Sequence, residues 1–419
     1  MSSRIETAPS CASAFEPGVL RVDEALADIL SQIEPLADAI KRPLRDCLGQ
    51  VLAQSVISPI NVPGHRNSAM DGYALRGSDL PDDSIQSFEI VGTAMAGASF
   101  EGDCQTGQCV RIMTGAIMPE GTDTVVMQEQ SERIDDTTVR IGSGHKLGQN
   151  VRQAGEDIAL GTTVFNPGRK ITAADLGILA SFGFAEVAVK RKIRVAFFST
   201  GDELRSVGET LVEGEIYDSN RYTLYGMLQQ LGVEILDMGV VPDQPERVKQ
   251  AFEQAAAMAD VVITSGGVSV GEADYIKPTL RELGEINFWK IAMKPGRPLT
   301  YGKLGKAHFF GLPGNPVAVM VTFLQFVKPA LQQLSGAEVT PPLRFKARAC
   351  NAIRKRPGRM EFQRGIYSQA DDGNLQVRLT GRQGSGILSS MSLANCFIVL
   401  PDEQADVAIG DEILVEPIL

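Results

Sequence analysis

The sequence predicts a multidomain protein of the α/β plus β class. From residue 192 to about residue 336, short apolar runs alternate with stretches of helical periodicity, which is typical of a mostly parallel α/β sheet domain with helices on both faces. Residues from about 58 to 160 form short alternating segments broken by glycine, aspartate and proline, which indicates a β-rich inserted domain. The tail from about residue 342 is β-like again and predicts a small barrel or sandwich.

The helical stretches repeat apolar residues at intervals of three and four, as in Tyr222, Tyr225 and Leu228. The runs between them are short and rich in β-branched or aromatic residues, as expected for strands. Residues 21–33 (RVDEALADILSQI) also have helical periodicity. We expect this early segment to pack on the α/β domain, which makes that domain discontinuous.

Composition and charge limit the possible functions. A chain of 419 residues with 43% hydrophobic and 22% charged residues can form several cores. The N-terminus lacks the features of a secretory signal, and no apolar run has the length of a membrane span, so we expect a cytoplasmic protein without membrane contact. The net charge of -11 argues against nucleic-acid binding through a global basic field, and the six scattered cysteines predict free thiols rather than a zinc site.

In a parallel sheet, ligands bind beyond the carboxyl ends of the strands. The segments that follow the apolar runs combine glycine, small hydroxyl residues and proline: 199–203 (STGDE), 242–243 (PD), 264–275 (TSGGVSVGEADY), 294–298 (KPGRP) and 311–316 (GLPGNP). Backbone N–H groups in such loops, together with helix N-termini, favour phosphate. The loops also carry carboxylates, which repel phosphate unless a hard cation such as Mg²⁺ bridges them. Nearby lysines and Arg297 complete a pattern that indicates phosphoanhydride chemistry.

Each of these signals also has a purely structural interpretation. Gly266 and Gly267 are equally compatible with a plain turn, because the loop has neither a dinucleotide fingerprint nor a P-loop pattern. The pair 202–203 is compatible with the acidic start of a helix, and Asp243 with a helix N-cap. Lys290, on a predicted strand, is compatible with a long side chain lying along apolar surface.

Eight motifs resemble, in order and spacing along essentially the whole chain, the MoeA family of molybdopterin molybdenumtransferases, which includes the E domain of gephyrin. They are NSAMDGYA (67–74), RIMTGA (111–116), GEDI (155–158), FSTGDEL (198–204), IYDSNR (216–221), SGGVSVGEADY (265–275), FWKIAMKPGRP (288–298) and GLPGNPV (311–317). The resemblance implies a homodimer of four-domain chains. The implied domains are a substrate-binding α/β domain (19–38 and 190–341), a segmented linker domain (39–57 and 161–189), the inserted domain (58–160) and a C-terminal β-barrel (342–419).

The resemblance also implies the reaction, in which adenylylated molybdopterin and molybdate give molybdenum cofactor and AMP with the help of Mg²⁺. The implied catalytic residues are Glu203, Asp243, Asp274, Lys290 and Lys294, with Asp243 and Asp274 as metal ligands. The implied substrate-binding residues are Asp71, Thr114, Arg152, Asp157, Gly266, Gly267, Ser269, Arg297, Pro313, Pro316, Arg359 and Ser385. Those of the inserted domain match family positions that face the crevice of the partner subunit.

Two other functions are compatible with parts of this pattern. The α/β domain resembles the molybdopterin adenylyltransferases, with which the resemblance also implies contact, but segment 266–274 (GGVSVGEAD) stands where those proteins are expected to have a GGT-type turn. They also lack the inserted and tail domains. A non-catalytic scaffold of the gephyrin E-domain type is the other alternative, although this chain shows no long linker for polymerisation.

Overall fold

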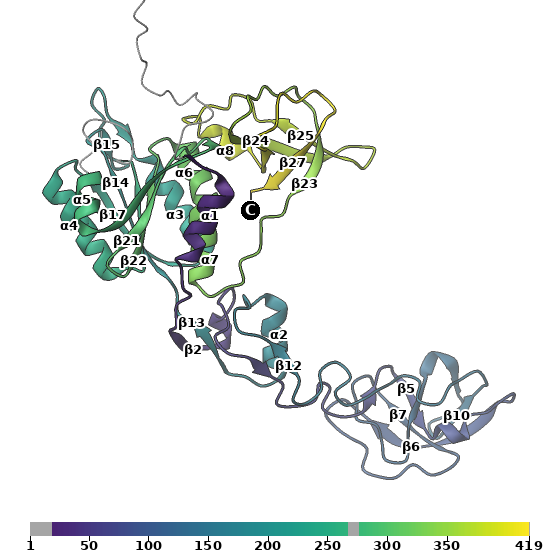
Figure 1. The fold of residues 1–419 in the computed structure, drawn as a ribbon. Coiled ribbons are helices and arrows are strands. Elements are labelled where there is room, and N and C mark those ends of the chain that lie inside the picture. Colours follow the sequence, from purple (N-terminus) through teal and green to yellow (C-terminus); the bar gives the residue numbers. More distant parts are fainter. Residues whose placement is uncertain (1–18, 267–275, 419) are drawn as a thin grey trace, which may run out of the picture. The chain divides into compact units, whose positions relative to one another are not determined.

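The computed structural model describes residues 19–266 and 276–418. The chain divides into two compact units, one formed by the segments up to Ile40 and from Lys190 onward, the other by Lys41–Val189. Figure 1 shows the helices and strands of both units.

The first unit contains a mixed sheet in the order β1-β19-β21-β22-β18-β14-β17. Its strands are β1 (Val19–Leu20), β14 (Arg194–Thr200), β17 (Glu234–Val241), β18 (Val261–Ser265), β19 (Gly284–Ile291), β21 (Pro298–Leu304) and β22 (Ala307–Leu312). All of them except β21 run in the same direction. The sequence did not predict β21, whose direction follows from its connection, because the two residues between β21 and β22 allow a hairpin but no parallel crossover.

Helices cover both faces of this sheet, as predicted (Figure 1). One face packs against α1 (Val22–Ser31), α3 (Ser219–Leu231), α6 (Pro316–Thr322) and α7 (Lys328–Leu334), and the other against α4 (Pro245–Met258) and α5 (Ile276–Leu283). This division follows from the alternation of side chains along a strand, which places successive residues on opposite faces of the sheet. Val195 and Phe197 of β14 lie in the first core, and Ala196 and Phe198 lie in the second.

A π-helical segment, Phe323–Val327, joins α6 to α7. The continuous helix Pro316–Leu334 is long and apolar enough to cross a membrane, but 67% of its most apolar window is buried inside the protein. Its residues Val319, Phe326 and Leu331 belong to the first core of the sheet domain. The helix is therefore accounted for as a core helix of the α/β domain.

The C-terminal strands close a five-stranded barrel through the pairing of β24 with β26. The barrel strands are β23 (Phe345–Ala349), β24 (Met360–Gln369), β25 (Leu375–Leu379), β26 (Cys396–Leu400) and β27 (Glu412–Pro417). The short strand β20 (Met293–Lys294), from a loop of the α/β domain, pairs with the start of β24. Phe362 and Phe397 of the barrel lie in the same core as α6, so the barrel and the α/β domain share buried surface.

The second unit contains a six-stranded sheet in the order β8-β5-β7-β6-β10-β9. Its strands are β5 (Gly72–Leu75), β6 (Gln86–Ala94), β7 (Gln108–Ile112), β8 (Thr124–Met127), β9 (Ser131–Arg133) and β10 (Thr138–Ile141). A separate core gathers residues from both sides of this β-rich segment, including Leu52, Val56, Phe165 and Leu179 of α2 (Ala173–Ser181). The α/β sheet, the β-rich segment and the barrel confirm the predicted fold class.

Candidate functional site

The predicted ligand loops of the first unit meet at one edge of the sheet. They follow β14, β17, β18, β19 and β22, which all run in the same direction and therefore end at the same edge. Glu203 lies exposed in the turn after β14, and Pro313 is buried directly after β22. Sequence order alone was sufficient to predict this arrangement, because each loop directly follows a buried apolar run.

Asn220, in the first turn of α3, bonds to two of these loops. Its Nδ2 donates a hydrogen bond of 2.9 Å to the Ser265 hydroxyl and another of 2.7 Å to the Gly314 carbonyl oxygen. Asp218 caps the same helix, because its Oδ1 accepts from the backbone N–H of Arg221 at 3.1 Å. The segment IYDSNR is thus in direct contact with Ser265 and with GLPGNP, and Gly266 also donates to the Leu312 carbonyl at 3.3 Å. The sequence reasoning did not single out Asn220, although it stands inside a quoted motif.

Five polar atoms at this edge are buried and lack a hydrogen-bond partner within the part of the chain that the structure describes. They are Ser199 Oγ, Thr200 Oγ1, Asp218 Oδ2, Asn220 Oδ1 and Thr264 Oγ1. Leaving such a group unpaired costs about 1–3 kcal/mol, so each one calls for an explanation. Their concentration where the ligand loops converge indicates a region arranged for bound polar groups rather than for the stability of the empty fold.

Two acidic residues of the edge lie together, because the backbone N–H of Asp243 donates to Asp202 Oδ1 at 3.1 Å. The helix-start interpretation of residues 202–203 is wrong, since a turn follows β14 there, and the N-cap interpretation of Asp243 is wrong, since Gln244 precedes the first residue of α4. Among the described residues, no three histidine, cysteine or acidic side chains form a metal cluster. Asp202 and Asp243 are described carboxylates at this point of the edge that could contribute oxygen ligands to a hard cation.

The end of β19 and the segment after it carry the predicted cationic residues. Lys290 is exposed on β19, and Lys294 follows on β20 with its Nζ at 3.4 Å from Glu361 Oε1 of the barrel. The turn continues through Gly296, which has a φ of 98° and where a Cβ would stand 2.5 Å from Thr322 Oγ1. Only glycine fits here, because the turn lies close to Thr322 of α6. The backbone N–H of Ile291 donates to the carbonyl of Arg297 at 2.7 Å and closes the loop.

The barrel adds Ser385 and a residue that the sequence reasoning missed, Arg364. The Ser385 carbonyl accepts from the backbone N–H of Val317 at 3.0 Å, which places Ser385 beside Pro316 at the start of α6, whereas Arg359 lies just before β24. Arg364 is 1% exposed and donates to Ser390 Oγ at 3.0 Å and to the Gly384 carbonyl at 3.1 Å.

Burial lowers the pKa of Arg364 to about 10. Within residues 19–266 and 276–418, no carboxylate pairs with its guanidinium. A buried charge without a counter-ion is costly, and here the guanidinium is held by neutral acceptors, Ser390 Oγ and the carbonyl of Gly384, the residue before Ser385. In the sequence, Arg364 stands out only as an arginine of the predicted C-terminal β domain, whereas in the structure it lies in a run of five buried residues, 361–365.

The second unit brings together a smaller group of predicted residues. Asp71 Oδ1 accepts from both the backbone N–H and the hydroxyl of Thr114 at 2.7 Å, and these bonds lower the pKa of Asp71. Arg152 is exposed on β11 (Val151–Arg152), which pairs with β4 (Asn67–Ser68). Asp157 is exposed, and its backbone N–H donates to the Val62 carbonyl at 3.1 Å.

Three predicted residues, Gly267, Ser269 and Asp274, lie outside the described residues. Gly266 is the last described residue of its loop and has a φ of 91°. A Cβ at this position would stand 2.7 Å from the Thr200 carbonyl oxygen, so the close approach of β14 and β18 at this turn requires glycine.

Three family models match consecutive parts of the chain. The MoeA N-terminal region (domain I and II) matches residues 20–183, the probable molybdopterin binding domain matches residues 196–333, and the MoeA C-terminal region (domain IV) matches residues 346–418. Among solved structures, the molybdopterin biosynthesis moeA protein from Pyrococcus horikoshii matches with a TM-score of 0.84 and 28% identity, covering 96% of this chain and 100% of that one.

Curated relatives agree with these matches. The chain is 33% identical to gephyrin of Dictyostelium discoideum, of which the match covers 62%, and 37% identical to the molybdopterin molybdenumtransferase of a Nostoc species, of which it covers 86%. It is 44% identical to the molybdopterin molybdenumtransferase of Haemophilus influenzae over 95% of this chain and 98% of that protein. Identity of this extent over nearly the whole of both chains shows that the protein belongs to the molybdopterin molybdenumtransferase family.

Proposed function

We propose that this protein inserts molybdate into adenylylated molybdopterin and releases AMP, as the last step in forming molybdenum cofactor. The observation that carries the proposal is the set of buried polar atoms without partners at the carboxyl edge of the sheet, since adenylylated molybdopterin offers hydroxyl, amide and phosphate groups to pair with them. The membership of the chain in the molybdopterin molybdenumtransferase family supports the same reaction.

The described residues provide three kinds of interaction for this chemistry. The backbone N–H groups of the glycine-containing loops suit the pyrophosphate. Arg364 and Lys294 suit a tetrahedral dianion such as molybdate, because both are cationic and lie at the junction of the α/β domain with the barrel. Asp243, with Asp202 beside it, and Asp274, which lies outside the described residues, would hold Mg²⁺, which would neutralise phosphate charge as the bond to AMP breaks.

We further propose that the protein acts in the cytoplasm as a homodimer and receives its substrate from a molybdopterin adenylyltransferase. In this proposal, Asp71, Thr114, Arg152 and Asp157 complete the crevice of the partner subunit. The Asp71–Thr114 pair supports it, because a carboxylate already fixed by two hydrogen bonds is oriented before any ligand arrives.

The reaction is tested by incubating the purified protein with adenylylated molybdopterin, Mg²⁺ and molybdate while AMP release is measured. AMP that appears only when molybdate is added supports the proposal. A parallel reaction with ATP and molybdopterin tests the alternative activity, and formation of adenylylated molybdopterin in that reaction would contradict the proposal.

The shared crevice is tested by mixing two variants, Asp71→Ala and Asp274→Ala. Each homodimer is expected to be inactive, whereas mixed dimers contain one crevice with both native residues and recover up to about a quarter to a half of the activity by symmetry. Sedimentation that shows a fully active monomer would contradict the homodimer proposal.

A further inference from the structure

Lys294 of the α/β domain and Glu361 of the barrel form an ion pair whose two side chains differ greatly in solvent exposure. The Lys294 Nζ lies 3.4 Å from Glu361 Oε1 and 3.5 Å from Oε2. The lysine side chain is 52% exposed, whereas the glutamate side chain is 5% exposed. The carboxylate is therefore the fixed member of the pair, and the ammonium group, at the end of a flexible side chain, is the movable one.

The position of Glu361 is determined by both backbone and side-chain contacts. Strand β20 pairs with β24 in the register Lys294 with Glu361, so the two residues stand side by side. Gln363, itself 7% exposed, donates from Nε2 to Glu361 Oε2 at 2.9 Å. The negative charge of Glu361 opposes the binding of an anion to the neighbouring Lys294. The fold nonetheless holds this carboxylate beside the lysine.

We propose that Glu361 is a positioning residue that acts as the internal counter-ion of Lys294 and lowers the affinity of this end of the site for oxyanions. In the free protein it holds the ammonium group toward the barrel. An incoming dianion shares Lys294 with Glu361, because an ammonium group has three donors. Glu361 thereby prevents weakly bound anions from occupying the molybdate position. This inference depends on the proposed function only in assigning Lys294 to the oxyanion.

The test measures binding of molybdate and of inorganic phosphate to the full-length protein by calorimetry. In Glu361→Gln the new side chain still accepts from Gln363 through Oε1 but carries no charge. We expect both anions to bind about two- to fivefold more tightly, the factor that corresponds to one partly exposed ion pair. Glu361→Asp keeps the charge and is expected to bind both anions within about twofold of the original protein.

The matched control is Glu412→Gln, which makes the same change of net charge on another strand of the barrel. Glu412 pairs with Lys346 at 3.3 Å and both side chains are exposed. It is expected to leave both affinities unchanged. An equal gain in this control would show a general effect of net charge and would overturn the proposal, as would unchanged or weaker binding by Glu361→Gln.

Lys294→Ala separates this inference from the proposed function. If Lys294 binds the oxyanion, this variant weakens molybdate binding, and adding Glu361→Gln to it restores no affinity. Weakened binding in Lys294→Ala without a gain in Glu361→Gln overturns the role of Glu361 alone. Unchanged binding in Lys294→Ala overturns the assignment of Lys294 in the proposed function and the inference with it.

Discussion

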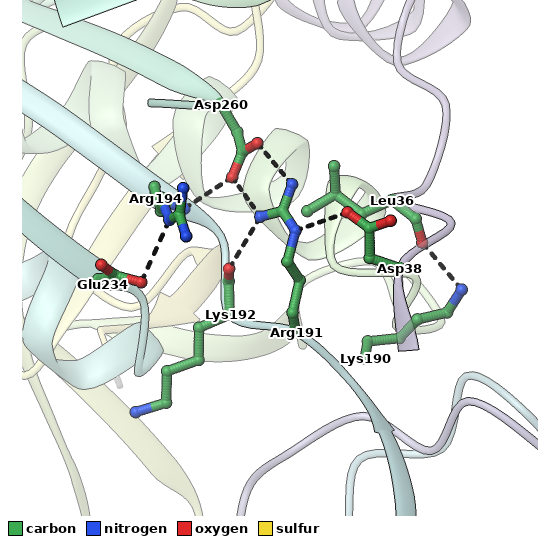
Figure 2. Close-up of polar contacts among 8 residues, drawn as sticks. All are labelled: Leu36, Asp38, Lys190, Arg191, Lys192, Arg194, Glu234 and Asp260. Carbon is green, nitrogen blue, oxygen red and sulfur yellow. Dashed lines mark hydrogen bonds and ion pairs between the residues drawn. The ribbon is translucent and has the colours of Figure 1, made fainter. Parts of the chain in front are cut away.

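The two edges of the large sheet differ in whether their polar groups have hydrogen-bond partners. At the amino edge, where β14 and β18 begin, Arg191 donates to both carboxylate oxygens of Asp260 at 2.7 and 2.8 Å and to Asp38 at 2.8 Å (Figure 2). The backbone N–H of Arg194 adds a bond of 2.8 Å to Asp260. At the carboxyl edge of the same two strands, Ser199, Thr200 and Thr264 have buried hydroxyls without partners among the described residues.

The amino edge is electrostatically satisfied. Burial alone would raise the pKa of Asp260, but its bonds to Arg191 and to the Arg194 N–H outweigh burial and lower that pKa. The bonds to Asp260 and Asp38 raise the pKa of Arg191. Lys190 adds a bond of 2.8 Å to the Leu36 carbonyl (Figure 2). The two edges therefore differ: paired, stabilising contacts lie at one end of these strands, and buried polar groups without partners among the described residues lie at the other.

The strongest test of this contrast is the substitution Arg191→Met. It removes the guanidinium from two carboxylates, and Asp260 has a side chain that is only 18% exposed. We expect the free energy of unfolding to fall by about 3 kcal/mol, the lower end of the range for breaking a buried pair. Urea unfolding followed by the fluorescence of Trp289, the only tryptophan and a residue of β19, measures this value for the sheet domain.

Arg194→Met serves as the matched control at the same edge. Its side chain pairs with Glu234 at 3.5 Å, both side chains are more than half exposed, and its backbone bond to Asp260 is retained. We expect a loss within about 0.5 kcal/mol. Equal losses in the two variants would contradict the special role of Arg191. AMP release by the folded fraction should be unchanged in both, since neither residue belongs to the proposed site.

A pH change affects the amino edge through His308, which is 7% exposed near the start of β22. Burial, aided by the charge of Lys303, lowers its pKa to about 4, and its Nδ1 lies 3.2 Å from the Tyr301 hydroxyl. Between pH 6.5 and 4 the unfolded chain therefore binds more protons than the native one, so stability falls as the pH falls. From pH 7 to 5 we expect a loss of about 2 kcal/mol.

The same Trp289 unfolding measurement at pH 7 and pH 5 checks this expectation. His308→Gln should remove most of the pH dependence, because the other two histidines belong to the second unit. Asp260 does not interfere, since its lowered pKa places its own loss of stability below about pH 4. A pH dependence that persists in His308→Gln would show that another group is responsible.

The contrast between the edges also shows what the sequence was able to predict. The loops of the carboxyl edge were predictable because each follows an apolar run that forms a strand. These strands run in the same direction, so the loops after them lie at the same edge of the sheet. The amino-edge network was not, because Arg191 contacts Asp38 and Asp260 at separations of 153 and 69 residues, which no local pattern indicates. Arg364 was missed for a related reason, since its burial depends on barrel closure. The helix-start and N-cap interpretations failed because turn and cap positions are set by tertiary contacts.

Apart from the Arg194→Met control, the smallest expected effect comes from Thr264→Val at the carboxyl edge. Thr264 is 0% exposed and its Oγ1 has no partner among the described residues, so valine, with nearly the same shape, removes an unpaired buried group. We expect unfolding followed by Trp289 to show a gain of about 1 kcal/mol, while AMP release falls because the ligand loses a hydroxyl partner. Ser265→Ala, next to it, should instead lose about 1 kcal/mol, because Ser265 accepts from Asn220. If Thr264→Val destabilises the protein or remains fully active, the unpaired hydroxyls at this edge are not reserved for a ligand, and the distinction between the two edges fails at the carboxyl end.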